Sequence, residues 1–144
     1  MRNRVAVLHG VNLDALDRRP AEHYGGLTFM QLETRIERFA DELGLEARFF
    51  QSNHEGEYVE EIHKAGDYAD GLLLNPGAWT HYAWSLRDAV EVSGLPAVEV
   101  HLSDVEKREE FRRVSVFDGV RVAKVSGRGV DGYRDALVAL KEAL

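Results

Sequence analysis

Amides, imidazoles, a guanidinium and a phenol follow the short apolar runs of this 144-residue sequence, at positions where a hydrophobic core would place apolar residues. In an open parallel sheet, ligands bind in the crevice beyond the carboxyl ends of the strands. The residues expected there suit acid–base chemistry on a small polar molecule; they are Asn12, Arg19, Tyr24, Asn75, His81, Glu99, His101, Leu102 and Ser103.

Tyr24 is a candidate base. A free phenol, which titrates at about pH 10, is a poor base at neutral pH, but a guanidinium beside it favours the phenolate. Arg19 lies five residues away in the same segment and can fold beside it. The alternative is a surface tyrosine that packs on the stem of its loop.

His81 and His101 each come just beyond a strand rather than on a helix face. Glu99 precedes His101 by two residues, so on an extended strand both side chains point the same way. A carboxylate there holds the imidazole tautomer and favours the protonated ring, which prepares a general acid. The alternative is a strand-end hydrogen bond without a catalytic role.

Two further segments offer ligand-binding groups. Asn75 begins a Pro-Gly turn after an apolar strand and can point its amide into the crevice, although the turn can also be merely architectural. The Leu102-Ser103 segment offers backbone N–H groups and a hydroxyl that suit a carboxylate. Arg108 and Arg112 are expected one helical turn apart on one face. They either clamp an anion or pair with neighbouring glutamates as a solvated face.

Five apolar runs alternate with helical patterns and predict the elements that position these groups. The expected strands are 4–8, 47–51, 71–74, 97–100 and 120–125. Thr28 and Gln31 form a capping box for a helix that ends at Gly44. Further helices are expected from Glu55 to Gly66, over 82–93, as a short charged helix over 106–112, and from Asp131 to the C-terminus. This alternation predicts a single α/β domain over 1–144, with a parallel five-stranded sheet covered on both faces.

Between Leu8 and Thr28 lie about nineteen residues without periodicity, where two to six residues would serve a strand-to-helix connection. The segment carries Arg18, Arg19, His23 and Tyr24 and ends in Gly25-Gly26, which can act as a hinge. We interpret it as a mobile lid.

The composition excludes several classes of function. A net charge of −7 argues against a general nucleic-acid or anionic-membrane binder, because both need a positive field. The chain has no cysteine, which excludes disulfides and thiolate sites and fits a reducing compartment. No run reaches the roughly 20 apolar residues of a membrane span, and no signal peptide precedes Val5. A cytoplasmic location is therefore expected.

Two patterns look like cofactor sites and are interpreted otherwise. Gly127 to Gly132 match G-x-G-x-x-G after a strand, but only twelve residues follow, too few for the second strand and acidic residue of a dinucleotide site. A tight strand-to-helix turn explains the glycines. The six histidines show no spacing typical of zinc ligands, so no metal site is expected.

Six ordered motifs resemble the type II 3-dehydroquinases (3-dehydroquinate dehydratases) over essentially the whole chain. They are His9-Gly10-Val11-Asn12-Leu13 with Arg19 and Tyr24-Gly25; Phe50 to Gly56; Asn75 to His81; Leu86 to Ala89; Glu99 to Ser103; and Lys107 to Arg112. The resemblance implies a flavodoxin-like three-layer sandwich that assembles as trimers packed into a dodecamer. It also implies reversible dehydration of 3-dehydroquinate, an anionic small molecule, to 3-dehydroshikimate in the shikimate pathway, through an enolate and without a metal or organic cofactor.

The resemblance also implies roles for individual residues. Tyr24, activated by Arg19, removes the C2 proton, and Asn12 stabilises the enolate through a held water. His101, oriented by Glu99, protonates the departing C1 hydroxyl. The substrate-binding set comprises Asn75, His81, Leu102, Ser103, Arg108 and Arg112, with Asp88 reaching in from a neighbouring subunit.

The chain departs from the family pattern at five positions. His9 and Val11 replace the usual Asn and Pro, Asp17 stands where glycine is usual, Pro20 comes one place early, and Val114 replaces a common histidine. None is a proposed catalytic group, but three alter the stem and lid, which bears on lid closure and substrate preference.

Three alternatives remain open at this point. The chain can be a non-catalytic flavodoxin-like module that binds a ligand or partner. It can run the same dehydration in quinate breakdown. It can also dehydrate its substrate through a Schiff base at Lys124, although we expect the Lys124 side chain to extend along the sheet edge and place its charge in water.

Overall fold

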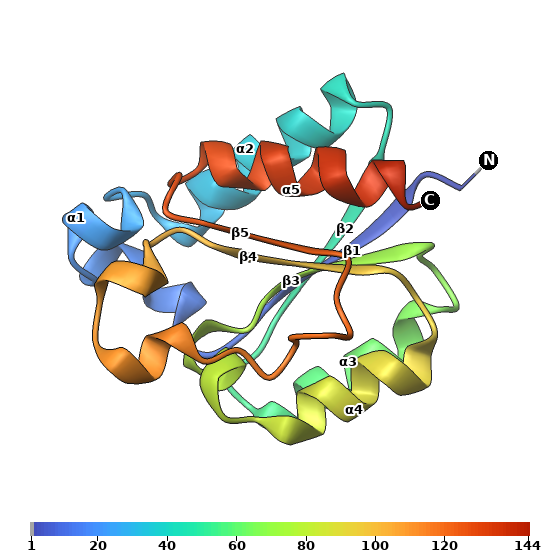
Figure 1. The fold of residues 1–144 in the computed structure, drawn as a ribbon. Helices are drawn as coiled ribbons and strands as arrows, with labels where there is room; N and C mark the ends of the chain where they lie inside the picture. The colour runs from blue at the N-terminus through green and yellow to red at the C-terminus, as the bar shows by residue number, and fades with distance from the viewer. Residues whose placement is uncertain (1) are drawn as a thin grey trace.

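The apolar runs form five strands of one parallel sheet in a computed structural model that describes residues 2–144 (Figure 1). The spatial order is β2-β1-β3-β4-β5, the order of flavodoxin-like doubly wound folds. The predicted fold class is therefore confirmed. The strands are β1 (Arg4–His9), β2 (Glu46–Gln51), β3 (Gly71–Asn75), β4 (Ala97–His101) and β5 (Ala123–Ser126).

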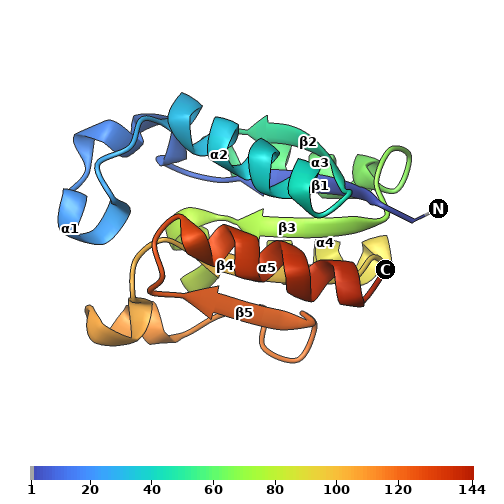
Figure 2. The same ribbon diagram turned by 90° about the horizontal axis from the view of Figure 1, so that it is seen from above.

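Helices cover both faces of this sheet. α2 (Phe29–Glu42) and α5 (Asp131–Glu142) lie on one face, and α3 (Glu55–Ala65) and α4 (Trp84–Ser93) lie on the other (Figures 1 and 2). Alternate residues of β1 enter the two resulting cores: Val5 and Val7 pack toward α2 and α5, whereas Ala6 and Leu8 pack toward α3 and α4. Burial on both faces explains why the central strands read as continuous apolar runs.

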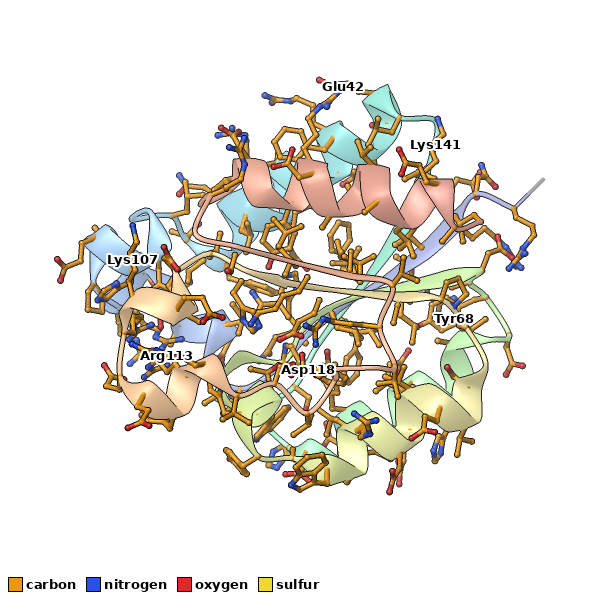
Figure 3. All side chains as sticks on the ribbon, viewed as in Figure 1. Glu42, Tyr68, Lys107, Arg113, Asp118 and Lys141 are labelled. Carbon is orange, nitrogen blue, oxygen red and sulfur yellow. The ribbon has the colours of Figure 1, made fainter. Side chains whose placement is uncertain are left out.

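Local signals set the ends of the long helices. Thr28 accepts a hydrogen bond from the Gln31 backbone, and the Gln31 side chain accepts one from the Thr28 backbone, so the predicted capping box is present. Gly44 follows this helix with a φ of 73°. Lys141 on α5 donates to the Leu43 carbonyl at 2.7 Å and ties the two helix ends together (Figure 3).

The carboxyl end of the sheet carries most of the irregular structure. The segment interpreted as a lid contains a 3-10 helix, η1 (Leu13–Arg18), and a one-turn helix, α1 (Ala21–Tyr24). It lies at the same end of the molecule as residues 105–113, which follow β4 (Figure 1). We call residues 105–113 the strap.

The strap corrects one sequence prediction. The expected charged helix over 106–112 is instead two 3-10 turns, η3 (Val105–Lys107) and η4 (Glu110–Arg113), separated by extended backbone at Arg108. Arg108 and Arg112 therefore do not share a helix face. The Arg108 side chain contacts the lid and Ser103, whereas Arg112 is paired with Glu109.

Two element boundaries also differ from the prediction. β5 begins at Ala123 rather than at residue 120, because the N–H groups of Val120 and Arg121 close a turn onto the Phe117 carbonyl. α4 begins at Trp84 rather than at residue 82, since the Tyr82 N–H bonds to the Trp79 carbonyl and completes η2 (Gly77–His81).

Lys124 also lies differently from the expectation. Its side chain is only 16% exposed, and its Nζ pairs with Glu106 of the strap at 3.3 Å rather than standing free in water. Within residues 2–144, no helix is both long and apolar enough to cross a membrane.

Candidate active site

A cleft at the carboxyl end of the sheet collects most of the predicted site residues. Its volume is about 360 Å³ when the open space at its mouth is included. The lining residues come from the lid, the ends of β3 and β4, η2 and the strap; they are Leu13, Arg19, Tyr24, Asn75, Gly77, Ala78, His81, His101, Leu102, Ser103, Val105 and Arg112. Eight of the twelve predicted site residues are in this set.

The Tyr24 hydroxyl is held by two guanidinium groups. Arg19 Nη2 donates to Tyr24 Oη at 2.5 Å, and Arg108 Nη1 donates to the same oxygen at 2.6 Å. The Arg19 guanidinium also lies 3.9 Å from the centroid of the Tyr24 ring. Two cationic donors therefore converge on one phenol oxygen. Sequence spacing indicated Arg19, whereas Arg108 comes from the strap, 84 residues away.

Positive charge is concentrated around this oxygen. Burial lowers the pKa of Arg19, and the neighbouring Arg108 and Arg112 charges lower it further, while Tyr24 acts in the opposite direction. Arg108 also donates to the Ser103 hydroxyl at 3.2 Å. A cleft with this charge suits an anionic ligand.

His101 and Glu99 form a buried pair at the end of β4. His101 Nε2 lies 2.5 Å from Glu99 Oε2, which leaves Nδ1 as the free ring nitrogen of a side chain that lines the cleft. Burial alone would raise the pKa of Glu99. Hydrogen bonds from His101, Thr80 and Ser115, together with the His101 charge, instead bring it to about 2. Glu99 is therefore ionised at neutral pH and orients the imidazole.

His81 lies next to His101 on the cleft wall. The two rings stack with centroids 6.4 Å apart, and His81 Nδ1 binds the Val114 carbonyl at 2.7 Å. Because this contact uses the backbone, it does not depend on the side chain that Val114 presents. Burial lowers the pKa of His81, the Val114 hydrogen bond opposes that effect, and the His101 and Arg112 charges add to it.

The Asn75 amide is held by the hydroxyl of a buried tyrosine, Tyr133. Asn75 Nδ2 donates to Tyr133 Oη at 2.8 Å, and Asn75 Oδ1 accepts from the Gly77 N–H at 3.3 Å. Tyr133 Oη lies 2.9 Å from Nε2 of His9, which is fully buried. Both ends of the amide are therefore fixed in one orientation, and the second N–H of Nδ2 remains available to a ligand.

The glycine-rich turn supports the Leu102-Ser103 segment. The Gly129 N–H bonds to the Leu102 carbonyl at 3.2 Å, and the Gly127 N–H bonds to the Ser103 carbonyl at 3.1 Å. In a planar trans peptide the N–H points opposite to the carbonyl, so the Ser103 N–H points away from the glycine turn. The turn therefore orients one wall of the cleft, and it opens α5 as the sequence predicted.

Four predicted site residues lie outside the cleft lining: Glu99 and Arg108 contact residues that line it, whereas Asn12 and Asp88 do not take part in those contacts. Asn12 is exposed at the start of η1 with a φ of 70°, and its backbone N–H donates to Asn53 Oδ1 at 2.8 Å. Left-handed backbone is uncommon for a residue other than glycine and often marks a functional position. Asp88 is exposed on α4.

Sequence reasoning missed the groups that support the site. Thr80, Ser115 and Arg121 contact Glu99, and Tyr133 contacts Asn75. Thr80 belongs to the Asn75 to His81 motif. Ser115 and Arg121 lie in the connection between η4 and β5, and Tyr133 lies on α5, so no sequence motif links these three residues to Glu99 or Asn75. In the part of the chain that the structure describes, no three histidine, aspartate or glutamate side chains are grouped so that they could hold a metal ion.

Comparisons with known proteins show which family this chain is similar to. The sequence profile of the family described as "Dehydroquinase class II" matches residues 3–141. A protein of Pelobacter propionicus named 3-dehydroquinate dehydratase is 43% identical over 142 residues, which cover 98% of this chain and 95% of that protein. One of the same name from Halothermothrix orenii is 46% identical over 138 residues, covering 96% and 93%.

Solved structures give the same result. The type II dehydroquinase of Butyrivibrio crossotus superposes with a TM-score of 0.92 at 37% identity and covers 97% of this chain and 98% of that one. A 3-dehydroquinate dehydratase-like protein of Bifidobacterium longum superposes with a TM-score of 0.70 at 27% identity, covering 97% and 96%. With a profile match over nearly its full length and relatives above 40% identity, this chain belongs to the class II dehydroquinase family.

Proposed function

We propose that this protein dehydrates 3-dehydroquinate to 3-dehydroshikimate, with Tyr24 as the base and His101 as the acid. The observation that carries the proposal is the phenol oxygen of Tyr24 between two guanidinium nitrogens, at 2.5 and 2.6 Å, in the cleft that His101 also lines. Removal of a proton beside a ketone needs a base, a stabilised enolate and an acid for the leaving hydroxide. The cleft supplies the base and the acid on separate elements.

The reaction proceeds in two proton transfers. The Tyr24 phenolate takes the C2 proton, and the electrons of that C–H bond form an enolate at the C3 carbonyl, stabilised by a water that Asn12 holds. The enolate then expels the C1 hydroxyl, which leaves as water with the proton from His101 Nδ1. Glu99 keeps the imidazole in place through Nε2.

The remaining polar groups bind the substrate. Arg112, with the backbone of Leu102 and Ser103, suits the substrate carboxylate. Asn75 and His81 suit its ring hydroxyls, through the free N–H of the Asn75 amide and through His81 Nε2. Arg108 acts on Tyr24 more than on the substrate, because its Nη1 is on the Tyr24 and Ser103 hydroxyls.

The protein is further proposed to act as a dodecamer built from trimers, in which Asp88 of one subunit reaches the site of the next. Two exposed aromatic side chains precede Asp88 in this chain: Tyr82 is 59% exposed, and Trp84, one helical turn before Asp88 on α4, is 60% exposed. Large exposed apolar side chains that cluster on one surface mark protein interfaces.

The test of the function is a steady-state assay with 3-dehydroquinate, which follows the absorbance of the conjugated product. Tyr24→Phe keeps the ring packing but removes the base, so we expect kcat to fall at least about a hundred-fold. Tyr68→Phe is the matched control. Its hydroxyl binds Glu61 at 2.6 Å, away from the cleft, and its activity should match the wild type.

Three results would contradict the proposal. Near-normal turnover by Tyr24→Phe excludes the tyrosinate mechanism. If the wild-type protein binds 3-dehydroquinate but does not convert it, the protein is a ligand-binding module and not an enzyme of this reaction. Covalent trapping by borohydride supports the Schiff-base route, which the geometry disfavours because Lys124 Nζ is paired with Glu106.

A further inference from the structure

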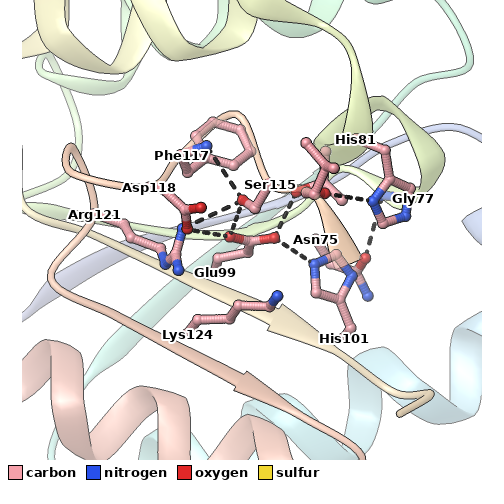
Figure 4. Close-up of polar contacts among 12 residues, drawn as sticks. Asn75, Gly77, His81, Glu99, His101, Ser115, Phe117, Asp118, Arg121 and Lys124 are labelled. Atoms are coloured by element: carbon pink, nitrogen blue, oxygen red, sulfur yellow. Dashed lines mark hydrogen bonds and ion pairs between the residues drawn. The ribbon is translucent and has the colours of Figure 1, made fainter. Parts of the chain in front are cut away.

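Glu99 is fully buried, and both of its oxygens are occupied. Oε2 receives the Thr80 hydroxyl at 2.5 Å in addition to His101 Nε2. Oε1 receives the Ser115 hydroxyl at 2.7 Å and lies 3.4 Å from Arg121 Nη1 (Figure 4). Four groups from three segments, namely η2, β4 and the connection between η4 and β5, therefore converge on a carboxylate that reaches the cleft only through His101.

Arg121 is the only guanidinium that contacts Glu99 among residues 2–144. It comes from the turn before β5, its side chain is 16% exposed, and its Nη1 also lies 2.6 Å from Asp118 Oδ1 and 3.3 Å from Ser115 Oγ. Asp118 is 68% exposed, so water screens that partner, whereas Glu99 is fully buried. Water therefore screens the Arg121 charge less in the contact with Glu99 than in the shorter contact with Asp118.

The position of Arg121 has a consequence for His101. Arg121 and Ser115 hold Oε1 on the side away from the cleft, so rotation of the carboxylate is blocked and Oε2 remains against His101 Nε2. Without the Arg121 guanidinium, Oε1 keeps only the Ser115 hydroxyl, and the carboxylate can rotate away from His101.

Other charged and titratable groups lie near the Glu99–His101 pair, on the helices, turns and strand that surround the end of β4. Lys124 pairs with Glu99 in the register of β4 and β5, but its Nζ is on Glu106. Arg87 of α4 donates to the Val116 and Asp118 carbonyls rather than to a carboxylate of the pair. The set is Tyr58, His81, Arg87, Arg112, Asp118, Arg121 and Lys124.

We propose that Arg121 is a positioning residue for the dehydration: it holds Glu99 in the rotamer that fixes His101 for proton donation. The inference rests on the proposed function, in which His101 is the acid. Arg121 contacts neither the substrate nor the cleft and acts only through Glu99.

The test compares Arg121→Met with Arg121→Lys. Met keeps much of the side-chain volume without the charge, and we expect kcat to fall about ten-fold with KM changed less than two-fold, since the acid is misplaced while the binding groups remain. Lys restores a cation and should recover most of the loss. Arg134→Met removes a similar arginine of α5, which pairs with Glu42 at 4.0 Å, and should leave kcat unchanged.

A spectroscopic measurement separates this inference from the proposed function. In the substrate-free protein, the His101 Nε2 proton should give a downfield ¹H resonance in wild type and Arg121→Lys that weakens or shifts in Arg121→Met. If the resonance depends on Arg121 but the wild-type protein does not turn over 3-dehydroquinate, the result supports the role of Arg121 in positioning His101 and contradicts the proposed dehydration. The opposite outcome is also distinguishable. If Tyr24→Phe loses activity but Arg121→Met keeps the wild-type kcat and the wild-type resonance, the proposed function stands and only the role of Arg121 is overturned.

Arg121→Gln is the second variant if Arg121→Met does not fold. Gln keeps an N–H donor for Glu99 and Asp118 but removes the charge, so kcat should still fall several-fold. A folded Arg121→Gln protein with wild-type kcat and an unchanged His101 resonance overturns the proposal.

Discussion

His9 shows how a departure from the family pattern is accommodated. It is fully buried, its Nε2 lies 2.9 Å from Tyr133 Oη, and its Nδ1 has no hydrogen-bond partner. Asn75 donates to Tyr133 Oη, and that hydroxyl has one hydrogen of its own, which a neutral His9 Nε2 can accept. Burial lowers the pKa of His9 to about 3, so the ring is neutral at physiological pH.

This burial predicts a pH dependence of stability. The pKa of His9 is about 3 when folded, against 6.5 as the reference value, so below pH 6.5 the unfolded chain takes up a proton that the folded chain does not. Stability is therefore complete above pH 6.5 and falls by about 1.4 kcal/mol per pH unit toward pH 3. Replacement of His9 by the family's asparagine should remove this term.

Urea unfolding at pH 7 and pH 5 measures the contribution of His9 to the free energy of unfolding. We expect wild type to lose about 2 kcal/mol more than His9→Asn between these two pH values. An equal loss in both proteins would show that His9 is protonated in the folded state.

The residue scale also shows which parts of the site were predictable. Tyr24 with Arg19 and Glu99 with His101 are neighbours in sequence, and the structure brings each pair into contact. Arg108 contacts Tyr24 across 84 residues, and Arg121 reaches Glu99 from a turn that carries no periodicity. Local spacing predicts local contacts, whereas these contacts depend on how the strands are ordered.

At the scale of elements, the hydrophobic periods predicted the five strands and the long helices, because each needs a buried face. The strap was mispredicted, since its charged residues have helical composition but its side chains bind other segments: Arg108 reaches the lid, and Glu106 pairs with Lys124 of β5. These contacts outweigh the helix propensity of the strap residues, so the backbone forms two 3-10 turns instead of one helix.

Close packing at the end of β1 gives a second stability prediction. A Cβ on Gly10 would lie 2.3 Å from the Pro76 carbonyl oxygen, a backbone atom in the turn that carries Asn75. Gly10→Ala should therefore destabilise the protein by about 1–3 kcal/mol and displace Asn75. Unfolding midpoints and the KM for 3-dehydroquinate measure the two effects.

Gly56→Ala is the control for this variant. Gly56 lies in the first turn of α3 with nothing within 4 Å of an added Cβ, so alanine should stabilise the helix by up to about 1 kcal/mol. Similar stability of the two variants would contradict the predicted clash.

At the scale of the whole molecule, the proposed assembly has a direct measurement. Light scattering should give a mass about twelve times the 16.2 kDa of one chain, because closed symmetric oligomers are the usual form of soluble assemblies. Full activity in a protein of monomer mass would contradict the role proposed for Asp88. Sequence alone suggested this assembly only through the family resemblance, since an interface leaves no periodic signal.

The three guanidinium groups of the cleft have a consequence for the unliganded protein. Arg19, Arg108 and Arg112 repel one another, and that repulsion is part of why Arg19 holds its proton less tightly than usual. A bound carboxylate compensates these like charges in the folded state, whereas the unfolded chain, in which they are far apart, gains nothing from the same anion. Occupancy and folding therefore reinforce each other, and the substrate acts as a thermal protectant of the protein that consumes it.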